Sequence, residues 1–188
     1  THFKEALEIN RQIENKRSEG INLGNLGLVY KNLGESDKAI SHHKEAIEIA
    51  KQIGDKRSEG VQLGNLGNIY KEIGQTESAI AHFKASIEIA KQIENKRSEG
   101  VQLGNLGFVY STLGQYENSI QYYKASIEIA KQIGDKRSQG IYLGNIGLVY
   151  EKLGQYENTI AHYKASIEIA TQIGDKRNQG IFLGNLGD

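Results

Sequence analysis

The sequence predicts an all-α fold, a solenoid built from antiparallel helical hairpins, and two observations carry this prediction. The first is an internal repeat of 40 residues, in which the string LGNLG or LGNIG returns at the same place in every period. The second is that each period contains two stretches whose apolar residues recur at steps of three and four, the spacing of one helix face. Such periodicity indicates a stack of one supersecondary unit rather than a globular core with a single site. The string begins at Leu23, Leu63, Leu103, Leu143 and Leu183.

The first helix of each pair is predicted over about residues 56–73 of the second period, between a capping residue and a stop. An Asp or Asn precedes it, and its side-chain oxygen can accept a hydrogen bond from a free amide of the first turn. A glycine follows the last apolar residue, as a left-handed C-terminal stop requires. The predicted N-caps are Asn15, Asp55, Asn95, Asp135 and Asp175, and the predicted stops are Gly34, Gly74, Gly114 and Gly154.

The second helix of each pair is predicted over about residues 77–93. It ends at a glycine in three turns, Gly54, Gly134 and Gly174, whereas Glu14 and Glu94 stand at this position in the other two. Because a residue with a side chain is strained at positive φ by about 1 kcal/mol, we expect these two turns to be tighter or differently shaped. The connections are short, so neighbouring helices should be antiparallel.

The repeat also predicts the organisation of the chain as one array over residues 1–188. The chain opens with Thr1 and contains no Met, so we expect it to be a piece of a longer protein. The expected divisions are a partial second helix at 1–14, full helix pairs at 15–54, 55–94, 95–134 and 135–174, and a partial first helix at 175–188.

The composition excludes several classes of function. The 23 Lys and Arg residues balance the 23 Asp and Glu residues, whereas binding to nucleic acid or to an anionic membrane needs an excess of positive charge. The absence of Cys removes disulfides, thiolate zinc sites and a cysteine nucleophile. No apolar stretch approaches the length of about 18 residues that spans a bilayer. We expect a cytoplasmic protein with no cofactor, no nucleic-acid partner and no membrane partner.

The ionisable residues do not predict an enzyme or a metal site. No Ser/His/Asp set and no pair of carboxylates is unique to one place in the chain, and catalysis needs one pre-organised site. The histidines of one repeat column lie a full repeat apart, too far for a single metal with bonds of about 2.1 Å. These histidines are His2, His42, His82 and His162.

One ordered set of residues resembles the tetratricopeptide repeat. In the second period it comprises Leu66, Gly67, Tyr70, Gly74, Ala79, Phe83 and Ser86. The 40-residue period is similar to the Pins/LGN class of G-protein signalling modulators and to bacterial multi-repeat proteins. Leu63 stands where the family usually has Trp, and the closing Pro is absent. The resemblance implies a right-handed superhelix whose first helices line a concave face, and a scaffold that binds a protein or peptide.

The stripe formed by Leu63, Leu66, Gly67, Tyr70 and Ile73 is expected to pack inward against the second helix. The remaining columns of the first helix then face the groove, and they vary from repeat to repeat while the inward columns barely change. Such variation fits a surface tuned for a partner, and relaxed drift at solvated positions is the alternative. The groove residues expected to bind a peptide are Val61, Asn68, Lys71, Val101, Phe108, Ile141 and Leu148.

One groove column is asparagine in every repeat. Asn is a mediocre helix residue, and its amide offers both donors and an acceptor to a peptide backbone. The family resemblance implies an amide clamp for bound peptides at this position. The alternative is a hydrogen bond between repeats that sets the helix spacing. The column comprises Asn25, Asn65, Asn105, Asn145 and Asn185.

Two further columns of the first helix leave alternatives open. An arginine column, with Arg57, Arg97 and Arg137 as candidate peptide contacts, could form a basic ladder that favours acidic side chains. Neutralisation by Glu59 and its equivalents, or by helix carbonyls, is the alternative that we favour. Gly64 is expected to face the groove, where it would let a ligand backbone approach or would serve close packing.

The leading functional hypothesis is therefore an interaction scaffold with a peptide in its groove. The alternative is a structural or regulatory spacer, or a sensor array, attached to another domain of a longer chain. The two ends carry complementary half-pairs, so we also expect head-to-tail contacts between molecules in a crystal. Side chains expected to lack cover there are Phe3, Ala6, Leu7 and Ile13 at the front, and Phe182, Leu183 and Leu186 at the back.

Overall fold

The computed structural model describes residues 2–187. Over this range the protein consists of ten α-helices joined by short turns, with no strand. The chain is therefore an all-α repeat solenoid, as predicted. None of the described helices is both long and apolar enough to cross a membrane. The helices are α1 (His2–Gln12), α2 (Lys16–Asn32), α3 (Ser36–Gln52), α4 (Lys56–Glu72), α5 (Thr76–Gln92), α6 (Lys96–Thr112), α7 (Tyr116–Gln132), α8 (Lys136–Lys152), α9 (Tyr156–Gln172) and α10 (Lys176–Gly187).

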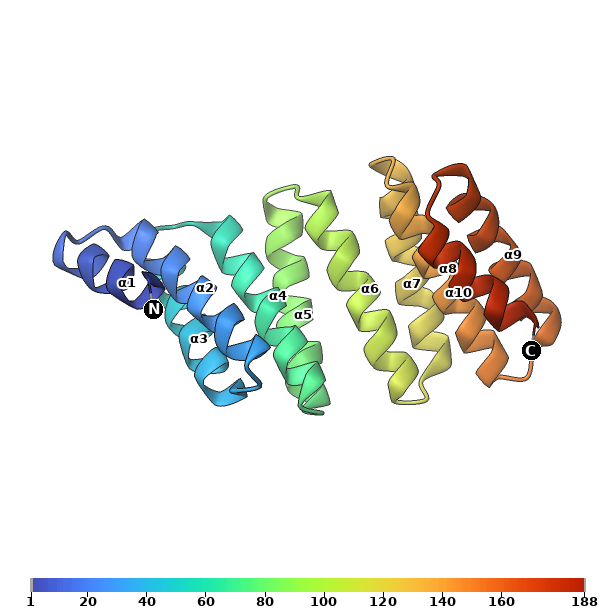
Figure 1. Ribbon diagram of the computed structural model, residues 1–188, viewed down its shortest axis with the longest axis horizontal. Helices are drawn as coiled ribbons and strands as arrows, with labels where there is room; N and C mark the ends of the chain where they lie inside the picture. Colours follow the sequence, from blue (N-terminus) through green and yellow to red (C-terminus); the bar gives the residue numbers. More distant parts are fainter. Residues whose placement is uncertain (1, 188) are drawn as a thin grey trace. The chain divides into compact units, whose positions relative to one another are not determined.

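The contacts divide the chain into two compact units, residues 1–98 and 99–188, and each is described by itself. In the first unit each helix from α1 to α5 packs against the next, and in the second unit α7 to α10 do the same. Figure 1 shows these neighbours as hairpins joined by short turns. We call α2, α4, α6, α8 and α10 the A helices, and α1, α3, α5, α7 and α9 the B helices.

The helix ends follow the predicted capping pattern. The side chain at each predicted N-cap accepts a hydrogen bond from the backbone N–H three residues on, at 2.9–3.2 Å. All seven glycines at the helix C-termini have φ between 69° and 75°. At Gly54 the next amide, Asp55 N, reaches back to Ala50 O at 2.8 Å, the hydrogen bond of a Schellman motif. These contacts satisfy end groups that the helix itself leaves unpaired.

The expectation of a different turn at Glu14 and Glu94 is wrong. Both residues take positive φ, 53° and 54°. The amide of Asn95 still reaches Ala90 O at 2.8 Å, as Asp55 N reaches Ala50 O. The hydrogen bonds of the motif thus hold the turn in one shape, and the glutamate takes the strained conformation.

Replacing Glu94 with Gly is expected to raise the free energy of unfolding by about 1 kcal/mol, because it removes the strain of a side chain at positive φ. Chemical denaturation of the variant and of the parent measures the difference. Gly54→Glu is the matched control and should lower stability by a similar amount. Equal stability of all three proteins would contradict the prediction.

The core of each hairpin is an aromatic ring lying on a glycine. A Cβ placed at Gly67 would come within 2.5 Å of the ring of Phe83, which is completely buried. The A and B helices therefore approach as closely as glycine allows. The same pairing joins Gly107 with Tyr123, Gly147 with Tyr163, and Gly27 with His43.

The inward stripe of the A helices differs from the expected one at its C-terminal end. Ile73 is 39% exposed, whereas Ile69 is buried. The helix ends at Glu72, so Ile73 lies in the turn and no longer follows the helical face. A second buried contact also recurs: the hydroxyl of Ser86 donates to Gly60 O at 2.8 Å, and Ser126 and Ser166 do the same to Gly100 and Gly140.

Candidate functional site

The exposed face of the A helices in the second unit is apolar. Val101 and Phe108 are seven residues apart on α6 and are 42% and 48% exposed. On α8, Ile141 and Leu148 repeat this spacing, and Leu148 is 37% exposed. The two helices are neighbours, because the ring of Tyr142 on α8 lies on Gly104 of α6. The four apolar residues therefore occur on two adjacent helices.

The corresponding positions of the first unit are apolar on α2, where Ile21 and Leu28 are 51% and 41% exposed, and mixed on α4. Val61 is 46% exposed, but Lys71 donates to Asn68 Oδ1 at 3.1 Å. Lys31 on α2 forms an ion pair with Glu72 on α4 at 2.9 Å. Partial burial lowers the pKa of Lys71 below its ordinary value. In the first unit, charged side chains thus join neighbouring A helices beside the exposed apolar residues.

The asparagine column divides into two groups by its hydrogen bonds. Asn65 and Asn105 each donate to the glutamine three residues earlier on the same helix, at 3.5 Å and 2.9 Å. Asn145 instead is a hydrogen-bond partner of the buried Tyr123 hydroxyl on the preceding B helix, and Asn185 is one for Tyr163. All of these side chains, and Asn25, are only partly exposed. The hydrogen bonds of Asn145 and Asn185 thus join neighbouring repeats, whereas those of Asn65 and Asn105 stay within one helix.

Each A helix has three glycines, and the second of them, Gly64 in α4, is buried. It therefore does not face an open groove, contrary to expectation. Gly104 and Gly144 are buried, and a Cβ there would come within 2.3 Å of Tyr142 and 2.0 Å of Phe182. Each glycine therefore receives a side chain from the next A helix, as Gly24 receives Gln62. Phe182, which we expected to lack cover, is accordingly buried. Leu7 is buried as well, against Leu23 and Leu26 of α2.

Two arginines of the column pair with the N-cap of the next A helix. Arg17 lies 3.8 Å from Asp55 Oδ2, and Arg137 lies 3.1 Å from Asp175 Oδ2. We call this contact the Arg–Asp pair. The expected neutralisation by Glu59 is wrong, because that carboxylate turns inward, is buried and binds Lys56 at 2.7 Å. Arg57 and Arg97 are exposed.

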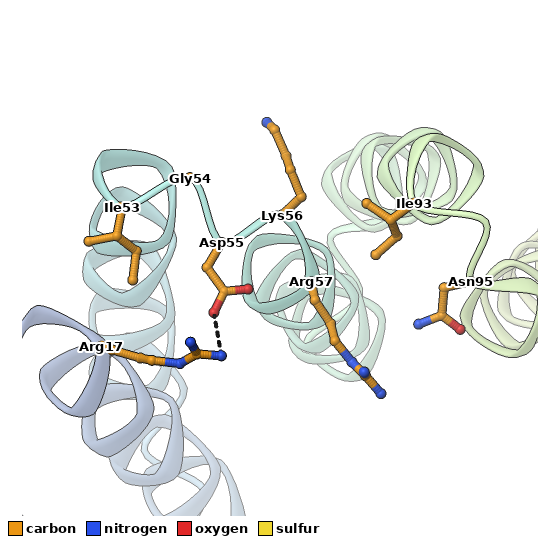
Figure 2. A pocket seen from close by; sticks show the side chains of 8 residues that line it. All are labelled: Arg17, Ile53, Gly54, Asp55, Lys56, Arg57, Ile93 and Asn95. Carbon is orange, nitrogen blue, oxygen red and sulfur yellow. Dashed lines mark ion pairs between the residues drawn. The ribbon is translucent and has the colours of Figure 1, made fainter.

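An open depression of about 910 Å³ lies beside two of these arginines. Figure 2 shows Arg17 with its ion-pair partner Asp55 on one side, and Arg57 extending towards the side of Asn95. Ile53 and Ile93 contribute apolar walls, and Gly54 and Lys56 complete the lining. All eight residues belong to the first unit.

Three histidines of the column, His42, His82 and His162, lie against tyrosine rings. Tyr30 lies over His42 with ring centroids 5.2 Å apart, and Tyr70 lies beside His82 at 4.9 Å. The stacks join each A helix to its B helix, which gives the column a packing role. Tyr110–Tyr122 and Tyr150–His162 repeat the pair at 5.1 Å and 5.0 Å.

A buried histidine is the feature that the sequence reasoning missed. His43 occupies the ring position held by Phe83 and Tyr123 in other repeats, and it is completely buried. Its Nδ1 lies 2.8 Å from Gln62 Oε1, and its Nε2 has no partner among the described residues. Burial lowers the pKa of this imidazole below its ordinary value. The signal was available, as a polar residue in an otherwise aromatic repeat column.

The fold and the exposed A-helix face together define a helical-repeat module for protein interaction. The chain belongs to the tetratricopeptide repeat family, whose model matches residues 1–52, 20–92, 57–132 and 99–172. This repeat is typically a non-enzymatic scaffold with protein or peptide partners. No curated protein matches the sequence.

Several solved structures share the fold at low sequence identity. Aspartyl phosphate phosphatase F from Bacillus subtilis superposes with a TM-score of 0.88 at 19% identity, over 96% of this chain and 47% of that one. A signal transduction ATPase with a tetratricopeptide repeat sensor, from Pyrococcus horikoshii, gives 0.82 at 21%, over 96% and 28%. A Rap protein complexed with competence and sporulation factor gives 0.81 at 19%, over 96% and 51%. This chain thus spans about half or less of the length of these three proteins.

Proposed function

We propose that the chain binds a peptide segment of a protein partner on the exposed face of its A helices, and that the apolar residues of α6 and α8 form one such site. The observation that carries the proposal is the exposure of Val101, Phe108 and Leu148 on adjacent helices. Exposed apolar patches on otherwise polar surfaces often mark interaction sites. The Rap protein complex among the similar structures supports the idea that this fold can accommodate a signalling factor.

The amide of Asn105 completes the site. It lies four residues after Val101 and three before Phe108, so the helical period places all three on one side of α6. Its present partner, the carboxamide of Gln102 at 2.9 Å, is itself only partly buried. Exchanging that bond for one to a peptide backbone therefore costs little. Asn65 offers the same arrangement in the first unit, whereas Asn145 is committed to Tyr123.

The test begins with peptides selected from a random phage-displayed library on the immobilised protein. Asn105→Ala is expected to weaken binding of a selected peptide about tenfold, on the scale of one lost hydrogen bond to a desolvated partner. Its thermal stability should stay close to that of the parent. Asn145→Ala should instead lower stability by about 1–2 kcal/mol, because it leaves the buried Tyr123 hydroxyl without a partner. Isothermal titration and thermal melts measure the two effects.

Two further variants complete the design. Phe108→Ser should weaken the same peptide by a similar factor without unfolding the chain. Gln121→Ala, at an exposed position of a B helix, is the matched control and should bind as the parent does. A sharp loss of stability in Asn105→Ala with unchanged affinity per folded molecule would assign the asparagine to structure and overturn its role as a clamp.

A sensor or spacer array within a longer protein is the second candidate. The similar ATPase whose tetratricopeptide repeats are described as a sensor favours it. Selection of no peptide that depends on Phe108 would support this alternative.

A further inference from the structure

The Arg–Asp pair shows how the chain itself satisfies an arginine at the start of an A helix. Arg17 and Arg137 each meet the N-cap carboxylate of the following A helix. That carboxylate also accepts the backbone N–H that caps its own helix, as Asp55 does from Ser58 at 2.9 Å. One aspartate therefore caps its own helix and also forms an ion pair with the arginine, whose charge is neutralised within the protein.

The pair is incomplete at Arg57. The N-cap that follows it is Asn95, a neutral amide, and Arg57 has no carboxylate within ion-pair distance among residues 2–187. The Oδ1 of Asn95 accepts the backbone N–H of Ser98 at 3.1 Å. Its Nδ2 is therefore left as a donor, and Figure 2 shows it on the side of Asn95 that faces Arg57. The change from Asp to Asn replaces an acceptor with a donor at the same position.

The surroundings of Arg57 favour an anion with apolar neighbours. The N-terminus of α4 begins at Lys56, and that of α6 begins one residue after Asn95. Helix N-termini carry a partial positive charge. Ile53 and Ile93, 42% and 36% exposed, line the same depression. The carboxylate that lines it, Asp55, accepts hydrogen bonds from Ser58 and forms an ion pair with Arg17.

From this geometry we infer that Arg57 and Asn95 form a separate contact point within the first unit, which binds an acidic side chain of the protein partner next to an apolar residue. The partner's carboxylate lies beside the Asn95 amide and neutralises Arg57, as Asp55 and Asp175 neutralise the other arginines. Arg57 forms an ion pair with it as Arg137 does with Asp175, and Asn95 Nδ2 donates a hydrogen bond to it. The inference rests on the proposed function, because it names the chemistry of the same protein partner.

The test uses the full chain and a peptide with the sequence Glu-Leu-Glu-Leu-Glu, with Gln-Leu-Gln-Leu-Gln as its matched control. The Nε–Hε resonance of Arg57, assigned with Arg57→Gln, reports on the site directly. It should shift with the acidic peptide and stay in place with the neutral one. Asn95→Asp restores the internal carboxylate and should weaken the acidic peptide about fivefold. Because Asn and Asp are equally good N-caps, the helix should remain intact.

Asp55→Asn is the opposite variant, since it opens the same arrangement beside Arg17. The Arg17 resonance should then respond to the acidic peptide, as it does not in the parent. The inference would be overturned if the chemical shift of the Arg57 resonance did not change with the acidic peptide, or changed equally in Asn95→Asp. A response to inorganic phosphate with none to the acidic peptide would overturn it as well.

The failure of this inference can be told from the failure of the proposed function. Phe108→Ser removes part of the A-helix face but leaves Arg57 and Asn95 unchanged. Loss of the Arg57 response with retained dependence of selected peptides on Phe108 overturns the inference alone. A retained Arg57 response with no dependence on Phe108 supports the inference and overturns the proposed A-helix site.

Discussion

Replacing Gly67 with Ala is expected to lower the free energy of unfolding by about 3 kcal/mol, although alanine is the better helix former by about 1 kcal/mol. The added Cβ would lie 2.5 Å from the ring of Phe83. That ring is completely buried, so it cannot move aside without displacing its neighbours. The helices must separate, and the packing of the hairpin is lost along with the ring contact. Chemical denaturation measures the effect.

Gly184→Ala is the matched control for this prediction. Position 184 also lies in an A helix, but a Cβ there meets no atom within 4 Å. This variant should be as stable as the parent or slightly more so. In a second control, Phe83→Leu combined with Gly67→Ala should recover part of the loss, because the smaller side chain leaves room for the methyl group. Equal stability of Gly67→Ala and Gly184→Ala would contradict the account of the core.

Acidification is expected to destabilise the first unit through His43. The folded protein lowers the pKa of this imidazole by burial, so the unfolded chain binds a proton more readily. The contribution of neutral His43 to the free energy of unfolding is fully present above the ordinary pKa of about 6.5. It falls as the pH drops below that value, by at most about 1.4 kcal/mol per pH unit for one proton. Denaturation curves between pH 8 and pH 5 measure the slope.

The structural reason is the lack of a second acceptor. Gln62 Oε1 accepts from Nδ1 of His43, and a proton on Nε2 would face the backbone of Gly27 with no partner. The neighbouring cation Lys31 and His42 add to the cost. His43→Phe, which copies the residue of the next repeat, should flatten the slope. His42→Tyr is the matched control and should leave most of it, and an unchanged slope in His43→Phe would contradict the assignment.

The helices were predictable from the sequence because local signals agree with the repeat. The caps and the glycine stops mark each helix end, and the observed bounds of α4 lie within one residue of the predicted ones. The sequence did not predict that the turn at Glu94 has the same shape as the glycine turns. The hydrogen bonds of this turn outweigh a backbone strain of about 1 kcal/mol. Residue propensities describe single positions, so they do not predict the outcome of that competition. The exposure of Ile73 was missed because a helical period was continued into a turn.

The parts of the candidate site that lie on one helix were predictable from the sequence. The contacts that join two helices were not. The exposure of Phe108 and Val101 follows from the helical period alone. The Arg–Asp pair joins Arg17 to a residue almost one full period later, Asp55, so reading each period separately could not reveal it. The same holds for Asn145, whose partner Tyr123 belongs to the preceding repeat.

The glycine that receives a side chain from the next A helix has a consequence for how such a chain can change during evolution. Gly24 accepts Gln62, Gly104 accepts Tyr142 and Gly144 accepts Phe182, so one contact tolerates side chains of different sizes and polarity. Gain or loss of a whole 40-residue period by recombination between similar gene segments therefore preserves the joint between repeats. Such an event changes which repeat carries an exceptional residue, such as Asn95. Length and binding pattern can thus diverge between related genes without any new packing solution.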